Sequence, residues 1–222
     1  MLTALTGALV SGLAHVLSGP DHLAAVAPLA AADRRRGWLT GCTWGIGHTS
    51  GVVLVALLAV MLRDLLPPLE VLSAWSERIV GVALIGIGVW ALRRSLHFGT
   101  APHAHGGVPH DHLHVQAGPS WARRLGHAHA SFYMGILHGV AGSSHFFGVL
   151  PALALPTRTA SLVYIAAFGA GSIVAMTAFA ATIGAAGGRL QQGTAGHRLL
   201  MMSAAVLALA VGGWWLAIGT GA

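Results

Sequence analysis

The chain has 222 residues, of which 55% are hydrophobic and only 8% are charged, and its mean hydropathy is +0.72. A soluble domain carries about 25% charged residues, so the composition excludes a soluble globular protein and predicts a polytopic membrane protein. All 12 basic residues are arginines in short clusters between apolar runs, a pattern that argues against nucleic acid as a partner. The single cysteine, Cys42, excludes a disulfide framework.

Six apolar segments are each long enough to cross a membrane, which takes about 20 helical residues. We expect them at residues 2–30, 38–62, 74–93, 131–153, 160–186 and 198–218. The first residues lack the positive charge that begins a signal peptide, so we expect no cleaved leader.

The arginines are unevenly distributed over the links between these segments. The second and fourth links hold only Arg63, Arg78 and Arg158, and all other arginines lie in the first, third and fifth links. Positive links tend to stay in the cytoplasm. We therefore expect a multi-pass protein of the plasma (inner) membrane with both termini outside and the long link 94–130 in the cytoplasm.

Two stretches of the chain share one pattern of residues. They are Gly12-x-x-His15-x-x-x-Gly19-x-x-His22-x-x-x-Val26-x-Pro28 and Gly135-x-x-His138-x-x-x-Gly142-x-x-His145-x-x-x-Val149-x-Pro151. A second pair, one residue out of step with the first, is Trp44-Gly-Ile-Gly-His48 and Phe168-Gly-Ala-Gly-Ser172. The matches indicate an internal repeat.

Each half of this repeat holds three expected helices, and an odd number of crossings gives the halves opposite topology. The sequence thus predicts an all-α membrane protein of six transmembrane helices in two inverted three-helix repeats. The repeats are residues 1–93 and 131–222, and the histidine-rich link 94–130 joins them. Transporters built in this way bind their substrate between the repeats near the membrane midplane.

The first repeated stretch carries polar groups that are costly inside a membrane and therefore indicate function. His15, Asp21 and His22 lie there, and Gly19-Pro20 predicts a local unwinding from Ser18 to Asp21. The candidate metal ligands of the whole chain are His15, Asp21, His22, His48, His138 and His145. Imidazoles with one carboxylate and no thiolate suit Ni(II), Co(II) or Zn(II), and the donor set alone does not choose among them.

The stretch Gly12-Leu-Ala-His15-Val-Leu-Ser-Gly-Pro-Asp21-His22-Leu-Ala-Ala-Val resembles the signature helix of the nickel/cobalt transporter superfamily (NiCoT/NicO), in particular its UreH-like branch. The stretches around His48 and from Gly135 to His145 resemble other blocks of that branch. The spacing differs from that of the eight-helix permeases of the superfamily by one extra residue before the Asp-His pair.

The resemblance implies a secondary transporter of Ni(II) or Co(II) that feeds urease, hydrogenase or cobalamin synthesis. Its implied ligands are His15, Asp21 and His22 in the first helix and His48 in the second. The expected partners are the divalent metal ion, the lipid bilayer and cytoplasmic metallochaperones of urease or hydrogenase assembly. The ion is the substrate, so no resident cofactor and no enzymatic activity are expected.

The long link is rich in histidine, glycine and proline. Its histidines are His97, His103, His105, His110, His112, His114, His127 and His129. A low-complexity segment of this kind binds metals loosely, and it lacks the apolar content to fold by itself. It either collects or presents ions in the cytoplasm or serves as a flexible linker.

Other functions compete with metal uptake. Export of the same ions fits the same residues, and the histidines can also tie helices together by hydrogen bonds. An intramembrane protease would use Ser143 or Ser144 with His145, but neighbours on a helix do not face each other. A lone Cys42 cannot cycle a disulfide within the chain. A carrier of anions or sulfur compounds on the same architecture is a further alternative, although Asp21 argues against a purely anionic substrate.

Overall fold

The computed structural model describes residues 2–33, 36–61, 69–96, 101–105, 108–112, 120–140, 151–152, 154–190 and 194–218. These residues form seven helices and one β-hairpin. The helices are α1 (Leu2–Ser18), α2 (Pro20–Ala32), α3 (Gly37–Met61), α4 (Leu69–Leu96), α5 (Ser120–Val140), α7 (Arg158–Arg189) and α8 (Ala195–Ile218). The strands are β1 (Ala101–His105) and β2 (Val108–His112).

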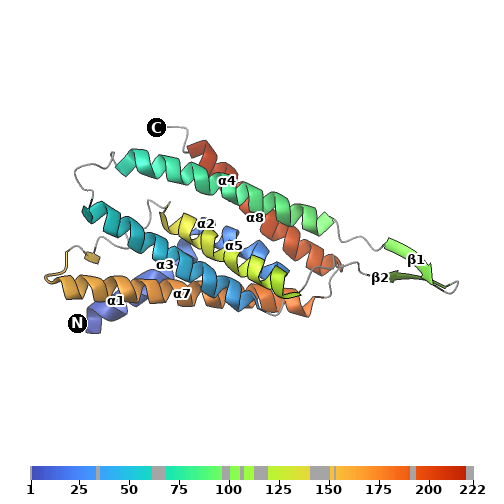
Figure 1. Ribbon diagram of the computed structural model, residues 1–222, viewed down its shortest axis with the longest axis horizontal. Helices are drawn as coiled ribbons and strands as arrows, with labels where there is room; N and C mark the ends of the chain where they lie inside the picture. The colour runs from blue at the N-terminus through green and yellow to red at the C-terminus, as the bar shows by residue number, and fades with distance from the viewer. Residues whose placement is uncertain are drawn as a thin grey trace.

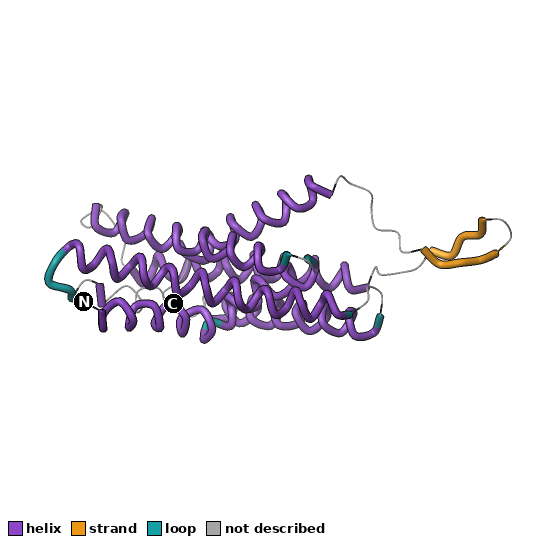
Figure 2. The backbone as a smooth tube through the Cα atoms, turned by 90° about the horizontal axis from the view of Figure 1, so that it is seen from below, coloured by secondary structure: helices purple, strands orange, loops and turns teal. Residues whose placement is uncertain are grey.

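The helices lie lengthwise in one elongated bundle (Figure 1). The view turned by 90° has the same elongated outline, with the hairpin projecting from one end and α1 beginning at the other (Figure 2). We call these the hairpin end and the terminal end. Helices α3, α5 and α8 begin at the hairpin end, whereas α1, α4 and α7 begin at the terminal end (Figure 1).

The surface of the bundle is apolar. Three of the described helices are long and apolar enough to cross a membrane, namely Glu77–Leu96, Arg158–Arg189 and Ala195–Ala217. Large apolar side chains such as Val82 and Leu162 are more than 60% exposed (62% and 67%). Soluble proteins rarely expose such side chains over wide areas, so lipid is the natural environment of this surface. The chain is a membrane protein.

The first apolar segment is broken where the sequence predicts it. Helix α1 ends at Ser18, Gly19 is extended, and Pro20 begins α2. Proline is suited to the first position of a helix because no N–H is needed there. The Gly19 N–H donates to the Val16 carbonyl and the Leu23 N–H donates to the Gly19 carbonyl, so the backbone at the break stays hydrogen-bonded.

The link 94–130 is more structured than expected. Helix α5 begins at Ser120 rather than near residue 131, and the strands β1 and β2 pair antiparallel in a hairpin. The first turns of α5 carry arginines and histidines, so an apolar run does not mark where this helix begins. The register of the hairpin pairs His105 with Val108 and Ala101 with His112.

Helices that precede the hairpin pack against helices that follow it. Helix α3 lies against α5 and α7, α1 lies against α7, and α4 lies against α8. The short helix α2 contacts α7 and α8 as well as its neighbour α3. The two parts of the chain therefore interdigitate in one bundle.

Glycines at equivalent positions of the two parts make equivalent helix contacts. A Cβ on Gly12 would collide with the Phe168 carbonyl, and a Cβ on Gly135 would collide with the Trp44 carbonyl. Gly12 and Gly135 are 123 positions apart, and Trp44 and Phe168 are 124 apart. Two further pairs of contacts correspond in the same way. A Cβ on Gly47 would meet the Phe132 carbonyl, as one on Gly171 would meet the Leu9 carbonyl. A Cβ on Gly88 would meet the Ala205 carbonyl, as one on Gly212 would meet the Gly81 carbonyl. Close backbone approach at small residues is typical of helix packing in membranes.

We predict opposite effects of alanine at two helical glycines. In Gly135→Ala the new Cβ meets the backbone of α3, which should lower the free energy of unfolding by about 1–3 kcal/mol. In Gly86→Ala the Cβ meets nothing within 4 Å, so the higher helix propensity of alanine should raise stability by up to about 1 kcal/mol. Thermal unfolding of both variants in detergent measures the difference. Equal effects would contradict the close α3–α5 contact.

Candidate metal centre

Four histidines and one aspartate from four helices gather in the middle of the bundle. His15 lies on α1, Asp21 and His22 on α2, His48 on α3 and His138 on α5. All except His15 are buried, and His15 is half-buried. The sequence predicts all five as metal ligands, and the structure brings all five together.

Three of these histidines form a group that could hold one metal ion. His15, His22 and His48 each contribute one ring nitrogen, and the three atoms lie within 4.8 Å of one another. The Nε2 atoms of His22 and His48 are 3.2 Å apart. Two imidazoles on one tetrahedral ion have nitrogens about 3.3 Å apart, given bonds of about 2.0–2.1 Å. The pair already has the spacing of metal ligands.

Asp21 fixes the chemical state of His22. The carboxylate Oδ1 of Asp21 lies 2.9 Å from Nδ1 of His22, which donates its hydrogen. In neutral His22 the lone pair is therefore on Nε2, the atom that faces His48. A carboxylate on the far nitrogen orients a metal-binding imidazole and makes it a stronger ligand. The geometry gives Asp21 this supporting position, whereas the sequence alone suggests only that it is a ligand.

The break between α1 and α2 is what allows this arrangement. A Cβ on Gly19 would lie 2.5 Å from Nδ1 of His22 and 3.1 Å from Oδ1 of Asp21. The two side chains thus fold back over the glycine, and any larger residue would push them away. A break is present where it was predicted, but it is narrower than the expected Ser18–Asp21, because only Gly19 leaves the helical conformation. His15 and His22 meet across it with their ring centres 4.8 Å apart.

The second part of the chain contributes His138 to the same place. Its ring centre is 5.9 Å from that of His22, and its Nδ1 donates to the Met134 carbonyl at 3.1 Å. In the neutral ring this leaves the lone pair on Nε2. His138 is therefore in the form that binds a metal, next to the group of three.

Two aromatic rings border the histidines. The Trp44 indole stacks on His48 with ring centres 4.9 Å apart and planes inclined by 15°. Phe168 lies 5.5 Å from His15. The sequence analysis used Trp44 and Phe168 only as repeat matches and missed their contact with the site. The signal for Trp44 was its spacing, because residues four apart share a helix face.

Some predicted residues fall outside this group. His145, Ser143 and Ser144 lie outside the described residues. His197 is buried on α8 and was missed, since the expected segment 198–218 begins one residue later. In the hairpin His103 pairs with His110 in the antiparallel register.

The chain is similar to known proteins from a bacterium and a plant. The urease accessory protein UreH of Bacillus sp. (strain TB-90) is 30% identical over 189 residues, which cover 83% of this chain and 77% of that protein. The Arabidopsis thaliana chloroplast proteins FOR GROWTH AND FERTILITY 1 and 2 are each 33% identical over 86% of this chain. The chain spans about half the length of these two plant proteins (52% and 50%). No protein-family model and no solved structure matches the chain.

Fold and site together define a helical membrane protein with a buried histidine group of the kind that holds a divalent metal. The match to the Bacillus protein covers most of both chains at 30% identity, which is enough to assign the family. The chain belongs to the UreH family.

We predict that the histidine group is the tightest metal site of the purified protein. His22→Ala should weaken Ni(II) binding more than 100-fold, and Asp21→Asn should weaken it about 10–100-fold, as expected for loss of a supporting carboxylate. Calorimetric titration in detergent measures both. The matched control is His129→Ala, an exposed histidine of α5, which should leave the tightest site unchanged. Unchanged binding in His22→Ala would contradict the site.

Proposed function

We propose that the protein is a secondary transporter that carries Ni(II) or Co(II) across a membrane through the His15–His22–His48 group. The observation that carries the proposal is the convergence of three imidazoles inside an apolar bundle, with a carboxylate orienting one of them. The relationship to a urease accessory protein favours nickel. The histidine donors suit both ions and also Zn(II).

We infer further that the bundle consists of six transmembrane crossings in two inverted repeats. The equivalent glycine contacts across the two parts support this, because a chance sequence match would not reproduce the packing. The opposite directions of α1 and α5, which carry the matched residues His15 and His138, support it as well (Figure 1). Inverted repeats place a substrate site near the membrane midplane.

The charges at the two ends favour a cytoplasmic hairpin end. Arg36, Arg93, Arg94, Arg189 and Arg198 lie there, whereas the described arginines of the terminal end are Arg78 and Arg158. Tryptophans accompany the arginines at both ends, with Trp75 under Arg78 and Trp90 under Arg94. Tryptophans at two levels of a bundle are typical of the two membrane surfaces. We place the termini outside and the membrane as the plasma membrane.

Binding involves the proton between the two facing imidazoles. Without an ion, His48 Nε2–H donates to the His22 Nε2 lone pair across 3.2 Å, since His22 has its hydrogen on Nδ1. An ion bound by both Nε2 atoms requires a lone pair on each, so the His48 hydrogen would move from Nε2 to Nδ1 of the same ring. The hydrogen would return to Nε2 when the ion leaves. Ion binding thus changes the tautomer of His48 without a net exchange of protons.

The hairpin histidines fit a role in handing ions over in the cytoplasm. His103 and His110 are paired in the register, and His105 and His112 lie on the same two strands. Loosely held imidazoles at the cytoplasmic exit would pass ions to metallochaperones of urease or hydrogenase assembly. Export instead of uptake uses the same residues in the opposite direction, and we keep it as the alternative.

The whole-cell metal content tests this function and its direction. Expression of the chain should raise cellular Ni or Co at least several-fold for uptake and lower it for export, while Mn stays constant. His22→Ala and Asp21→Asn should abolish the change although the protein still reaches the membrane. The control is again His129→Ala. Undiminished accumulation by both site variants would end the assignment.

Labelling of single cysteines tests the topology. With Cys42 replaced by serine, we expect a membrane-impermeant maleimide to label Thr159→Cys in intact spheroplasts and not Ala195→Cys, because these exposed residues begin α7 and α8 at opposite ends. Inside-out vesicles should give the reverse pattern. Labelling of both residues from one side would contradict the proposed orientation.

A further inference from the structure

The two aromatic residues beside the histidine group occupy equivalent positions in the two repeats. Trp44 on α3 and Phe168 on α7 each stand four residues before a buried polar residue, His48 and Ser172 respectively. The carbonyls of Trp44 and Phe168 meet the equivalent glycines Gly135 and Gly12. Their rings also contact equivalent histidines at the same distance, since Trp44 lies 5.5 Å from His138 and Phe168 lies 5.5 Å from His15.

The equivalent positions lie on opposite sides of the ion site. Helix α3 begins at the hairpin end, so Trp44 lies one turn nearer that end than His48 (Figure 1). Helix α7 runs the other way, so Phe168 lies one turn nearer the terminal end than Ser172. The Trp44 ring contacts His22 and His48, whereas the Phe168 ring contacts His15, so an ion held by the three histidines would have the two rings on different sides.

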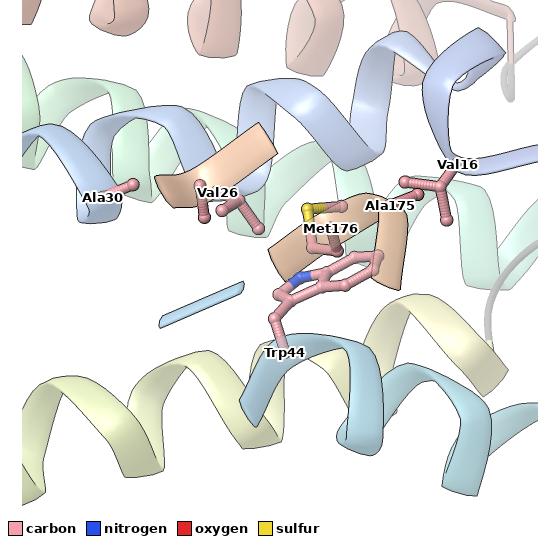
Figure 3. Close-up of a cluster of buried hydrophobic side chains, with 7 residues drawn as sticks. Val16, Val26, Ala30, Trp44, Ala175 and Met176 are labelled. Carbon is pink, nitrogen blue, oxygen red and sulfur yellow. The ribbon is translucent and has the colours of Figure 1, made fainter. Parts of the chain in front are cut away.

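On the hairpin side of the site the packing is closed. Trp44 is fully buried in a cluster with Val16, Val26, Ala175 and Met176. Figure 3 shows the indole lying against Met176, with Val16 toward one side and Val26 toward the other. An ion cannot pass this cluster unless the indole moves.

On the terminal side a small crevice of about 10 Å³ adjoins the site, although His48 and Phe168 are themselves buried. His48, Thr49, Val52, Val53, Ile165, Phe168 and Gly169 line it, and these residues follow α3 and α7 from His48 toward the terminal end. The repeat explains the difference between the sides. Val52 corresponds to Met176, which is larger and packs beside Trp44.

The indole is held at a cost. Its Nε1–H is buried and has no acceptor among the described residues. A buried donor without a partner costs about 1–3 kcal/mol, and such groups in native structures call for an explanation. A side chain that must leave its packed position during a transport cycle would explain the missing hydrogen bond. Without that bond, less free energy is needed to move the indole out of the ion route.

We propose that Trp44, together with Met176, is the gate that closes the ion route on the hairpin side, and that Phe168 is its counterpart on the terminal side. This inference rests on the proposed transport function and names the residues that control access to its site. In the conformation described both rings are packed, and a small crevice lies beside His48 on the Phe168 side. Passage of an ion requires each ring to move in turn.

The experiment measures access to both sides of the site by thiol labelling, with Cys42 replaced by serine. A cysteine at Thr49 reports on the crevice, and a cysteine at Ala175 reports on the packing around Trp44. A membrane-impermeant methanethiosulfonate reagent is applied to spheroplasts and to inside-out vesicles. With Trp44 present, Thr49→Cys should react from the terminal side and Ala175→Cys should react from neither side.

Removal of Trp44 should change the access pattern, whereas removal of Phe168 should not. Trp44→Ala should raise labelling of Ala175→Cys from the hairpin side about tenfold, which corresponds to a shift of about 1.4 kcal/mol, and should lower labelling of Thr49→Cys. Phe168→Ala, the matched control, should leave Ala175→Cys protected and Thr49→Cys reactive. Trp44→Phe keeps a ring in place and should behave like the unaltered protein.

Two results would overturn the gate. One is protection of Ala175→Cys in Trp44→Ala, and the other is the same change of labelling in the Trp44→Ala and Phe168→Ala variants. If Trp44→Ala does not reach the membrane, Met176→Ala removes the other half of the same contact and must give the same exposure. The labelling uses no metal, so the gate and the proposed transport function can fail separately. A wrong labelling pattern would contradict the gate alone. Absence of metal accumulation would contradict the transport function and leave the labelling result valid.

Discussion

The hydrogen bond between Asp21 and His22 is the interaction on which the rest of the site depends. A carboxylate and several imidazoles inside an apolar bundle are costly unless they satisfy one another. Asp21 accepts from Nδ1 of His22, which turns the Nε2 lone pair of His22 toward His48. That hydrogen bond offsets part of the free-energy cost of burying the carboxylate. It also leaves the lone pair of His22 Nε2 available to a cation.

The contact in turn requires an interrupted helix and close packing around it. Gly19 leaves room for the Asp21 and His22 side chains. Pro20 begins α2 at a position where the helix needs no backbone N–H. Around this break, glycines bring α1 against α7 and α5 against α3 at backbone distance. Because these pairs join the two parts of the chain, the site is enclosed by both. A motion that opens it must slide or tilt helices within an interdigitated bundle rather than separate two blocks.

The sequence predicts the local features of this site well. The helix break follows from Gly19-Pro20, because the effects of both residues on the backbone are local. The grouping of His15, His22 and His48 follows from the repeat and the resemblance, and the structure places them together. The cost of buried polar groups is also a property of single residues. Such predictions need no knowledge of which helices are neighbours.

Features that depend on contacts between helices could not be predicted. Nothing in the spacing of Trp44 states that its ring stacks on His48 and packs on Met176 from another helix. The start of α5 at Ser120 was missed because its first turns are polar and resemble a link. The supporting role of Asp21, as opposed to direct ligation, required the 2.9 Å contact with His22 to be seen.

The central claim is that the three imidazoles hold the transported ion, and X-ray absorption spectroscopy tests it most directly. The purified protein is loaded with one equivalent of Ni(II), so that the tightest site fills before the hairpin histidines. The account predicts a first shell containing about three imidazole nitrogens, with a loss of imidazole scattering from that shell in His48→Ala. A shell made only of oxygen, or a spectrum identical in the variant and the unaltered protein, would contradict it.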